Sequence, residues 1–410
     1  MKVLVYKFFT ATVLLLSFVS LSFSQTLSKN SQDNITQIVS ESLREYSIPG
    51  AVALVTNGDK EIYSHAFGFS DVLNKKAMDV ENIFRIASMT KPITSTGLML
   101  LIEKGILNLE DPMLDHLPDQ PAFEIFDEVN FDDGTFSTKK AENAVTIKHL
   151  LTHTSGMAYN FNSFELAAAN EPLFSRDRYL LQHEPGEKWT YGPSTNIVGD
   201  LIVEKSGKGL FEFFKEELFE PLGMEETFFD VPVEKTGRVV TIHQKIGSGF
   251  VEGENPEIIS SPELGHGGLN STASDYAKFM RLYLNNGVSD PGEQILLPET
   301  VELISSNHIG DLRAELQPAS RPQFARPFPQ GAGKDEWGLG FQLTGAEDEY
   351  QRSLGSMSWA GIFNTKFWID RNANIAAVLL MQYLPFDDDY HLDVLRKFEE
   401  AVYRNLELYH

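Results

Sequence analysis

The chain of 410 residues contains no cysteine. This absence excludes disulfide bonds, thiolate zinc sites, a thiol nucleophile and a lipoprotein anchor. Basic residues are also scarce: 34 Lys and Arg stand against 58 Asp and Glu, which gives a net charge of −24. So acidic a chain argues against a nucleic-acid partner. We expect the densest acidic runs, residues 126–133 and 387–389, to be solvated surface.

Motifs of several other enzyme classes are absent too. The chain has no Gly-x-Ser-x-Gly nucleophile elbow, no phosphate-binding P-loop and no His-Glu-x-x-His zinc motif. His149 and His153 stand four residues apart without an acidic residue between them, so local hydrogen bonding is favoured over metal binding. His266 is followed by two glycines and either lines a cleft or serves a turn. We therefore expect no cofactor and no metal.

The N-terminus has the pattern of a secretory signal peptide. Lys2 and Lys7 precede the apolar stretch FFTATVLLLSFVSLSFS, and small residues fit a cleavage site before Gln25. The alternative is a retained anchor, but the stretch is short for a bilayer span and is rich in hydroxyl residues. We predict that residues 1–24 are removed. The mature protein would then be exported, periplasmic or extracellular, without a stable membrane anchor.

Patterns of strands occur at both ends of the mature chain. Two β-rich runs, 51–56 and 61–69, are joined by Asn-Gly-Asp-Lys, a strong hairpin signal, and strands are also expected at 363–369 and 375–382. Helical patterns precede and follow them. We therefore predict an α/β fold, an antiparallel sheet flanked by N- and C-terminal helices. Residues 25–85 and 331–410 would form this sheet domain, and residues 86–330 an inserted helical domain with long loops.

The stretch FRIASMTKPITSTGLML, residues 84–100, places Ser88 three residues before Lys91 and puts Pro92 directly after it. Proline lacks an N–H and is tolerated only in the first turn of a helix, so the helix begins at about residues 88–91. Ser88 then lies at the positive end of the helix dipole, which favours a developing negative charge on oxygen. Lys91 shares its helix face and acts as its base if burial lowers the lysine pKa. The alternative is an N-cap serine beside a surface lysine.

Six further segments follow in order: TIKHLLTHTSGM (146–157), PGEKWTYGPSTNIVG (185–199), PLGMEETFF (221–229), GHGGLNSTASDYAKFMRLYLNNG (265–287), GLGF (338–341) and SWAGIF (358–363). Together with the serine and lysine they resemble the motifs of the serine β-lactamase and penicillin-recognising superfamily, in its class C-like branch. The resemblance covers nearly the whole mature chain. The fold that it implies agrees with the layout expected from the residue patterns.

The resemblance implies a role for each matching residue. Ser88 would be the acylated nucleophile and Lys91 its base, while Tyr191 would share proton transfer to the leaving group and from the deacylating water. The backbone N–H groups of Ser88 and Ile362 would form the oxyanion hole. For Tyr191, the alternative is a core tyrosine.

The third motif, SWAGIF, would bind substrate through Trp359, Ala360 and Gly361. Gly361 would let substrate lie against the strand backbone, because a side chain there would collide with it. For Trp359, the alternative is a packing role.

Two positions depart from the superfamily pattern. Asparagine often stands two residues after the tyrosine, where this chain has Pro193, and we do not expect Asn196 to replace it. The third motif usually begins with lysine or histidine, where this chain has Trp359. These departures resemble the family VIII carboxylesterases, because an apolar ring suits an ester without a carboxylate. The opposing possibility is that Arg313, Arg321 or Arg326 of the loop 309–336 supplies the missing cation; otherwise these arginines are solvated.

Two classes of function follow. The first is a secreted serine hydrolase that forms an acyl-enzyme, most simply a carboxylesterase on small esters. Its variants are a β-lactamase, a D-Ala-D-Ala carboxypeptidase or a D-aminopeptidase. The second class is a non-catalytic penicillin-binding or sensing module. In each case the expected partner is a small-molecule ester, amide or β-lactam and not a nucleic acid.

Overall fold

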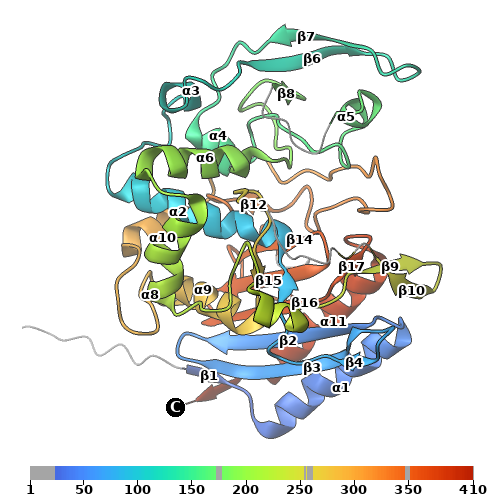
Figure 1. Ribbon diagram of the computed structural model, residues 1–410. Coiled ribbons are helices and arrows are strands. Elements are labelled where there is room, and N and C mark those ends of the chain that lie inside the picture. The colour runs from blue at the N-terminus through green and yellow to red at the C-terminus, as the bar shows by residue number, and fades with distance from the viewer. Residues whose placement is uncertain (1–23, 172–177, 254, 256–261, 347–350, 410) are drawn as a thin grey trace, which may run out of the picture.

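The structure is a computed structural model that describes residues 24–171, 178–253, 255, 262–346 and 351–409 (Figure 1). The expected signal peptide, residues 1–24, lies outside the described residues except for Ser24, so it stays a prediction. Among the described residues, no helix combines the length and the apolar character needed to cross a membrane.

Both ends of the chain contribute to one antiparallel sheet of eight strands, in the order β12-β13-β14-β15-β16-β2-β3-β4. Its strands are β12 Glu336–Trp337, β13 Gln342–Leu343, β14 Met357–Gly361, β15 Thr365–Asp370, β16 Ile375–Leu380, β2 Gly50–Asn57, β3 Glu61–Asp71 and β4 Lys76–Ala77. Strand β16 pairs with β2, with Ala377 opposite Val55, so that segments more than 300 residues apart meet in the middle of the sheet. Strand β2 is buried along its whole length because helices cover both faces.

The flanking helices are those that the sequence predicts. Helices α1 Lys29–Glu45 and α11 Asp389–Asn405 lie side by side on one face, and their apolar side chains form one core with the sheet (Figure 1). Ser28 and Asp388 cap their N-termini. Helix α9 Ala273–Leu284 covers the other face, against β2 and β16. The expected α/β fold, an antiparallel sheet flanked by terminal helices, is confirmed.

The middle of the chain is built around α2 Thr90–Glu103, which is buried on all sides over its first twelve residues. A Cβ added at Gly97 would lie 3.2 Å from the Phe213 ring and 3.3 Å from Ile202, so glycine lets the neighbouring helices approach closely. The neighbours that contact Gly97 are α6 Ser194–Ser206 and α7 Leu210–Phe214. The other helices of this part of the chain are α3 Met113–His116, α4 Ile147–Leu151, α5 Phe164–Ala168, η2 Lys215–Phe219, α8 Glu220–Leu222, η3 Val233–Arg238 and α10 Pro298–Ile304.

The middle of the chain also contains strands that the sequence patterns did not indicate. A sheet of order β7-β6-β8 lies at the top of Figure 1, far from the main sheet. Smaller sheets have the orders β10-β9-β17 and β11-β5, in which β17 comes from the C-terminal part of the chain, and β1 pairs with β18 near the two ends of the chain. The strands are β6 Phe123–Val129, β7 Phe136–Lys140, β8 Tyr179–Leu181, β9 His243–Ile246, β10 Gly249–Glu252, β17 Tyr383–Leu384, β11 Asn270–Ser271, β5 Phe84–Arg85, β1 Ser24–Thr26 and β18 Glu407–Tyr409. The exact border between the two expected domains stays a prediction.

The two acidic runs have different environments. Residues 126–133 span the β6–β7 hairpin, and their carboxylates are exposed, as expected. The expectation was wrong for 387–389, because Asp387 and Asp388 are buried. Asp387 lies 2.7 Å from Lys366 Nζ, and Asp388 accepts a hydrogen bond from Tyr383 and caps α11. Burial is tolerated here because each carboxylate gains a cation or a donor.

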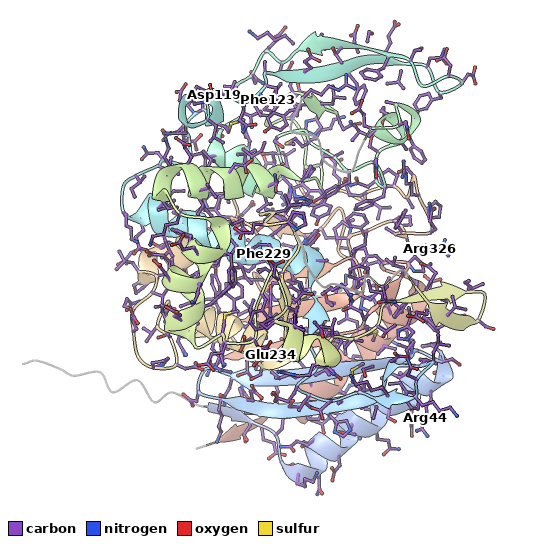
Figure 2. All side chains as sticks on the ribbon, in the orientation of Figure 1. Arg44, Asp119, Phe123, Phe229, Glu234 and Arg326 are labelled. Atoms are coloured by element: carbon purple, nitrogen blue, oxygen red, sulfur yellow. The ribbon has the colours of Figure 1, made fainter. Side chains whose placement is uncertain are left out.

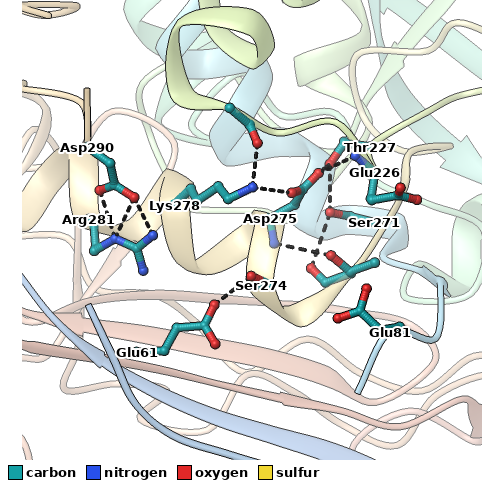
Figure 3. A network of polar contacts seen from close by, with 12 residues as sticks. Glu61, Glu81, Glu226, Thr227, Ser271, Ser274, Asp275, Lys278, Arg281 and Asp290 are labelled. Atoms are coloured by element: carbon teal, nitrogen blue, oxygen red, sulfur yellow. Dashed lines mark hydrogen bonds and ion pairs between the residues drawn. The ribbon is translucent and has the colours of Figure 1, made fainter. Parts of the chain in front are cut away.

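A polar network fixes α9 in place (Figure 3). The Asp275 carboxylate accepts hydrogen bonds from the backbone N–H of Glu226 at 2.6 Å and from Thr227 Oγ1 at 3.0 Å. Lys278 and Arg281 extend the network to other carboxylates and carbonyl oxygens. The segment that follows α8 is therefore tied to the helix that supports the centre of the sheet.

Candidate active site

Ser88 stands in the middle of a short 3-10 helix, η1 Ala87–Met89, which leads directly into α2. Ala87 has a φ of +45°, a conformation that costs an L-residue free energy and that concentrates at functional sites. Pro92 is the third residue of α2, where its missing N–H removes no intrahelical hydrogen bond. The predicted helix start is confirmed, and Ser88 is half-buried at this entrance.

The Lys91 side chain is buried, with only 1% of its surface exposed. Its Nζ lies 3.1 Å from Ser88 Oγ, 3.0 Å from Tyr159 Oη and 2.7 Å from the carbonyl oxygen of His266. None of these three partners carries a negative charge. Burial therefore lowers the pKa of Lys91 well below its usual value, because an ammonium group would lose its hydration there. The surface-lysine alternative is excluded, and the amine is placed to act as a base.

The Tyr191 ring lies beside the same amine, with its centroid 4.9 Å from Lys91 Nζ. Burial raises the pKa of Tyr191 above its usual value, although hydrogen bonding with Ser88 and Trp359 opposes part of this rise. The phenol is therefore protonated at neutral pH. It is buried like a core tyrosine, yet its hydroxyl lies beside the hydroxyl of Ser88, so it is positioned to carry a proton there.

Two side chains hold the backbone of Tyr191. Its N–H donates to Gln317 Oε1 at 3.2 Å, and its carbonyl oxygen accepts from Asn162 Nδ2 at 2.9 Å. Asn162 Nδ2 also donates to Gln317 Oε1 at 3.1 Å. Gln317 belongs to the irregular stretch 309–336, so part of that loop is a fixed wall of the site. Neither Gln317 nor Asn162 was anticipated from the sequence.

Tyr159 is the principal site residue that the sequence analysis missed. It lies two residues beyond the segment 146–157, and its buried hydroxyl joins Lys91 to His266 Nδ1, at 2.8 Å from the latter. Burial, with a smaller contribution from Tyr191, raises the pKa of Tyr159 well above its usual value. Both alternatives for His266 hold, because it stands in a turn between Leu264 and Gly267 and its ring and carbonyl oxygen contact Tyr159 and Lys91.

Strand β14 forms another wall and lies against η1. Trp359 is 5% exposed, and its ring centroid lies 4.9 Å from that of Tyr191 and 4.8 Å from that of Trp337. Its indole N–H makes no hydrogen bond of regular geometry within the part of the chain that the structure describes. Ala360 stands opposite Lys366, and the alternation of side chains along a strand directs it to the face opposite that of Trp359. Trp359 therefore packs on Tyr191, whereas the side chain of Ala360 points away from the site.

Gly361 ends β14 beside the Ser88 turn. A Cβ added there would lie 2.3 Å from the carbonyl oxygen of Ile86 and 2.4 Å from Thr365 Oγ1. We expected a side chain at this position to collide with substrate. The structure gives a different reason for the glycine, because a side chain would already collide with the protein itself. Ile362 is half-buried in the turn that follows, and its place in an oxyanion hole stays a prediction.

The departures from the motif pattern have structural consequences. Pro193 caps α6, and Asn196 is buried within that helix. The Asn196 amide makes no hydrogen bond among the described residues, and the expectation that it does not replace the missing asparagine stays a prediction. Arg313 donates to two carbonyl oxygens of its own loop, and Arg326 is exposed at the periphery of the molecule (Figure 2). Arg321 is half-buried on the same loop.

The two histidines four residues apart take separate structural roles. His149 Nδ1 accepts from the backbone N–H of Thr146 at 3.2 Å and completes a capping box at the start of α4. His153 is buried against three aromatic rings, including that of Tyr191 at 4.9 Å between centroids. Burial, with a smaller contribution from Lys91, lowers the pKa of His153 well below its usual value, so its ring is neutral.

Taken together, a hydroxyl at the entrance of a helix contacts a buried amine and lies beside a protonated phenol. Such an arrangement deprotonates the hydroxyl for attack on a carbonyl carbon and returns a proton to the group that leaves. Aromatic rings surround the buried Lys91 amine, and their low polarity strengthens the polar interactions there.

Comparisons with known proteins agree with this geometry. A family model described as Beta-lactamase matches residues 35–400. An uncharacterised Mycobacterium tuberculosis protein is 30% identical over 82% of this chain and 86% of its own. The lovastatin esterase of Penicillium rubens is 27% identical over 87% of this chain and 94% of its own. In fold, the chain is similar to simvastatin synthase from Aspergillus terreus, with a TM-score of 0.78 and 21% identity over 92% of this chain and 98% of that one. The chain therefore belongs to the β-lactamase family, as its motifs predicted, and is an enzyme of the serine hydrolase type.

Proposed function

We propose that the protein is an exported carboxylesterase that cleaves small neutral esters through an acyl-enzyme on Ser88. The observation that carries this proposal is the buried Lys91 amine, which lies 3.1 Å from Ser88 Oγ and has no anionic partner among its hydrogen bonds. Burial without an anionic partner favours the neutral form of the amine, and a neutral amine accepts a proton.

Acylation begins as Lys91 Nζ accepts the hydroxyl proton of Ser88 and Ser88 Oγ bonds to the ester carbonyl carbon. The charge that develops on the carbonyl oxygen is stabilised by the backbone N–H groups of Ser88 and Ile362. When the tetrahedral intermediate collapses, the alcohol oxygen takes the proton of the Tyr191 hydroxyl. Lys91 passes its extra proton to Tyr191, so the alcohol leaves neutral and both side chains return to their starting states.

Deacylation repeats these steps with water. A water molecule attacks the acyl carbon, and its proton passes through Tyr191 to Lys91. Ser88 Oγ then leaves the carbon and takes that proton back. The products are a carboxylic acid and the free hydroxyl, and the cycle needs no metal or cofactor.

The substrate class rests on Trp359. The third motif of the superfamily usually begins with a cation or a hydrogen-bonding group, which holds a substrate carboxylate. Here the position holds an indole that packs on Tyr191. A lost charge-assisted hydrogen bond costs roughly 1.5–3 kcal/mol. A net charge of −24 also repels anionic substrates at low salt. The similarity to a lovastatin esterase supports ester cleavage over β-lactam cleavage.

The test compares kcat/KM for p-nitrophenyl butyrate and a chromogenic cephalosporin in the wild type, Trp359→Lys and Trp359→Phe. We expect the wild type to favour the ester and Trp359→Lys to shift the ratio toward the cephalosporin. The shift should be about tenfold or more, since each 1.36 kcal/mol is tenfold. Trp359→Phe keeps an apolar ring and should leave the ratio unchanged. A wild type that prefers the cephalosporin would overturn the substrate class and point to a loop arginine.

A non-catalytic penicillin-binding or sensing module would behave differently. It would release one equivalent of p-nitrophenol and then stop, because its acyl-enzyme would not hydrolyse. Steady release after the first equivalent is the result that the proposal requires.

Export is tested on the same protein. Full-length protein expressed in a Gram-negative host should be recovered outside the cytoplasm with Gln25 as its first residue. Recovery of the intact N-terminus in the cytoplasm would overturn this part of the proposal and leave the chemistry unaffected.

A further inference from the structure

The hydrogen bonds around Lys91 form a chain that continues beyond the two residues expected to act on Ser88. Lys91 Nζ contacts Ser88 Oγ, Tyr159 Oη and the carbonyl oxygen of His266. Tyr159 Oη in turn contacts His266 Nδ1 at 2.8 Å. His266 therefore meets the chain twice, once through its backbone and once through its ring.

The number of hydrogens available decides the direction of each bond. A neutral amine has two N–H donors and one lone pair, and a backbone carbonyl only accepts. One N–H of Lys91 is therefore committed to the His266 carbonyl. The remaining N–H and the lone pair are shared between Ser88 and Tyr159. Lys91 is a base for Ser88 only when its second N–H points to Tyr159.

That arrangement requires the Tyr159 hydroxyl to donate elsewhere, and within the described part of the chain His266 Nδ1 accepts from it. If Nδ1 instead carried a hydrogen, it would donate to Tyr159. The Tyr159 hydroxyl would then turn toward Lys91 and occupy its lone pair. Lys91 would donate to Ser88 and would no longer accept its proton.

We propose that His266 is a positioning residue, whose unprotonated Nδ1 orients the Tyr159 hydroxyl and so directs the lone pair of Lys91 at Ser88. This inference rests on the proposed role of Lys91 as a base. It assigns His266 the tautomer with hydrogen on Nε2, and it gives Tyr159 the role of a fixed acceptor for Lys91. Neither residue then needs to change its own charge during the reaction.

The backbone around His266 is built to hold this position. A Cβ at Gly265 would lie 2.3 Å from the carbonyl oxygen of Thr195, and Gly268 has a φ of +105°. Leu264 and Gly267 form a bridge across the turn. Gly265 lets the turn pack closely against α6, and Gly268 supplies the backbone conformation that the turn needs, so the His266 carbonyl and ring are presented to the site together.

The experiment measures the rate at which a fluorophosphonate labels Ser88 in the wild type, Tyr159→Phe, His266→Ala and the double variant. We expect each single variant to lose about tenfold or more in rate, which corresponds to 1.4 kcal/mol. Because His266 acts through Tyr159, the double variant should be no slower than Tyr159→Phe alone. Losses that multiply in the double variant would overturn the proposal.

A second comparison separates orientation from folding. His266→Asn places an amide oxygen where Nδ1 stands, whereas His266→Gln places it one carbon farther, where Nε2 stands. We expect Asn to restore most of the labelling rate and Gln to resemble Ala. His65→Ala removes an exposed histidine on β3 and should change nothing. Equal rates for Asn and Gln would contradict the inference, and thermal melting of each variant shows whether it is folded.

The readout also separates this inference from the proposed function. Fluorophosphonate labelling needs only an activated Ser88 and no particular ester. A wild type that is not labelled would refute the activation of Ser88 itself. A labelled wild type whose rate is unaffected by these substitutions would refute only the role of His266.

Discussion

Replacing Lys91 with methionine should change how stability depends on pH, and the sign follows from the burial of the amine. The side chain is 1% exposed and its hydrogen-bond partners are uncharged, so its pKa in the folded protein lies well below that of the unfolded chain. Between these two pKa values the unfolded chain binds one proton more than the folded protein. The free energy of unfolding of the wild type therefore rises with pH over this range. Lys91→Met lacks this contribution.

The magnitude follows from the proton count. One proton released on folding corresponds to about 1.36 kcal/mol for each pH unit. Over each pH unit that lies between the two pKa values, the stability of the wild type should therefore rise by this amount relative to Lys91→Met. The offset between the two proteins at one pH depends on the hydrogen bonds and packing that methionine changes. The slope depends only on the proton.

Urea unfolding of both proteins at pH 7, 8 and 9, followed by tryptophan fluorescence, measures this slope. Lys104→Met is the matched control, because Lys104 is half exposed and pairs with Glu217 at the surface. Its stability should run parallel to that of the wild type. A difference between wild type and Lys91→Met that stays constant with pH would mean that Lys91 is charged when folded. The argument for a neutral base would then fail.

Three further changes test other parts of the site. Tyr191→Phe should lower kcat on the order of 10²–10⁴-fold with little change in KM, as for a lost proton carrier; a loss below about tenfold would move the proton path elsewhere. Gly361→Ala should destabilise the protein by about 1–3 kcal/mol and impair activity, because its Cβ would meet a backbone carbonyl oxygen at 2.3 Å. Gly237→Ala is the control and should show neither effect, because the space around Gly237 is open. Gln317→Ala should lower the free energy of unfolding by about 1–3 kcal/mol, because it leaves the Tyr191 N–H without its acceptor, and it should lower kcat. Replacing the exposed Gln323 with alanine should do neither. Equal effects of the two substitutions would show that the hydrogen bond from Gln317 to Tyr191 is unimportant.

The parts of the fold that the sequence predicts are those with strong local signals. The Asn-Gly hairpin between β2 and β3 and the alternation in β15 are visible in single segments of the chain. Helix α1 begins at Lys29, well before its first apolar residue Ile35, because Ser28 caps it and its first turn is polar. The β6–β7 hairpin escaped notice because its strands are rich in charged residues, acidic in β6 and basic in β7, with little alternation to mark them.

The catalytic candidates also divide into residues that stand in local sequence motifs and residues that do not. Ser88, Lys91 and Tyr191 stand in ordered motifs, and Pro92 fixes the first two on one helix end. Tyr159 and Gln317 join the site only through tertiary contacts, from positions 68 and 155 residues away from Lys91 and Asn162. No local pattern marks a tyrosine hydroxyl that will meet a buried amine. The nearest motif was the segment 146–157, which ends two residues before Tyr159.

The buried carboxylates of Asp387 and Asp388 show that local composition alone does not predict whether an acidic residue is exposed. A run of three aspartates is typical of solvated surface, and only the third is exposed here. The partners that allow burial come from two different sheets, because Lys366 lies on β15 of the main sheet and Tyr383 on β17 of a smaller one. These contacts depend on the tertiary arrangement, which a charge count along the chain does not contain.

The identity of the nucleophile is the central claim, and trapping the acyl-enzyme tests it most directly. The wild type and Ser88→Ala are mixed with p-nitrophenyl butyrate, quenched in acid after the burst, digested and mapped by mass spectrometry. We predict a single butyryl adduct on Ser88 in the wild type and none in the variant, which should remain folded. Ser155 and Ser194 are buried and hydrogen-bonded to each other at 2.7 Å, so they should stay unmodified. An adduct on either of them, or a burst that survives in Ser88→Ala, would contradict the account.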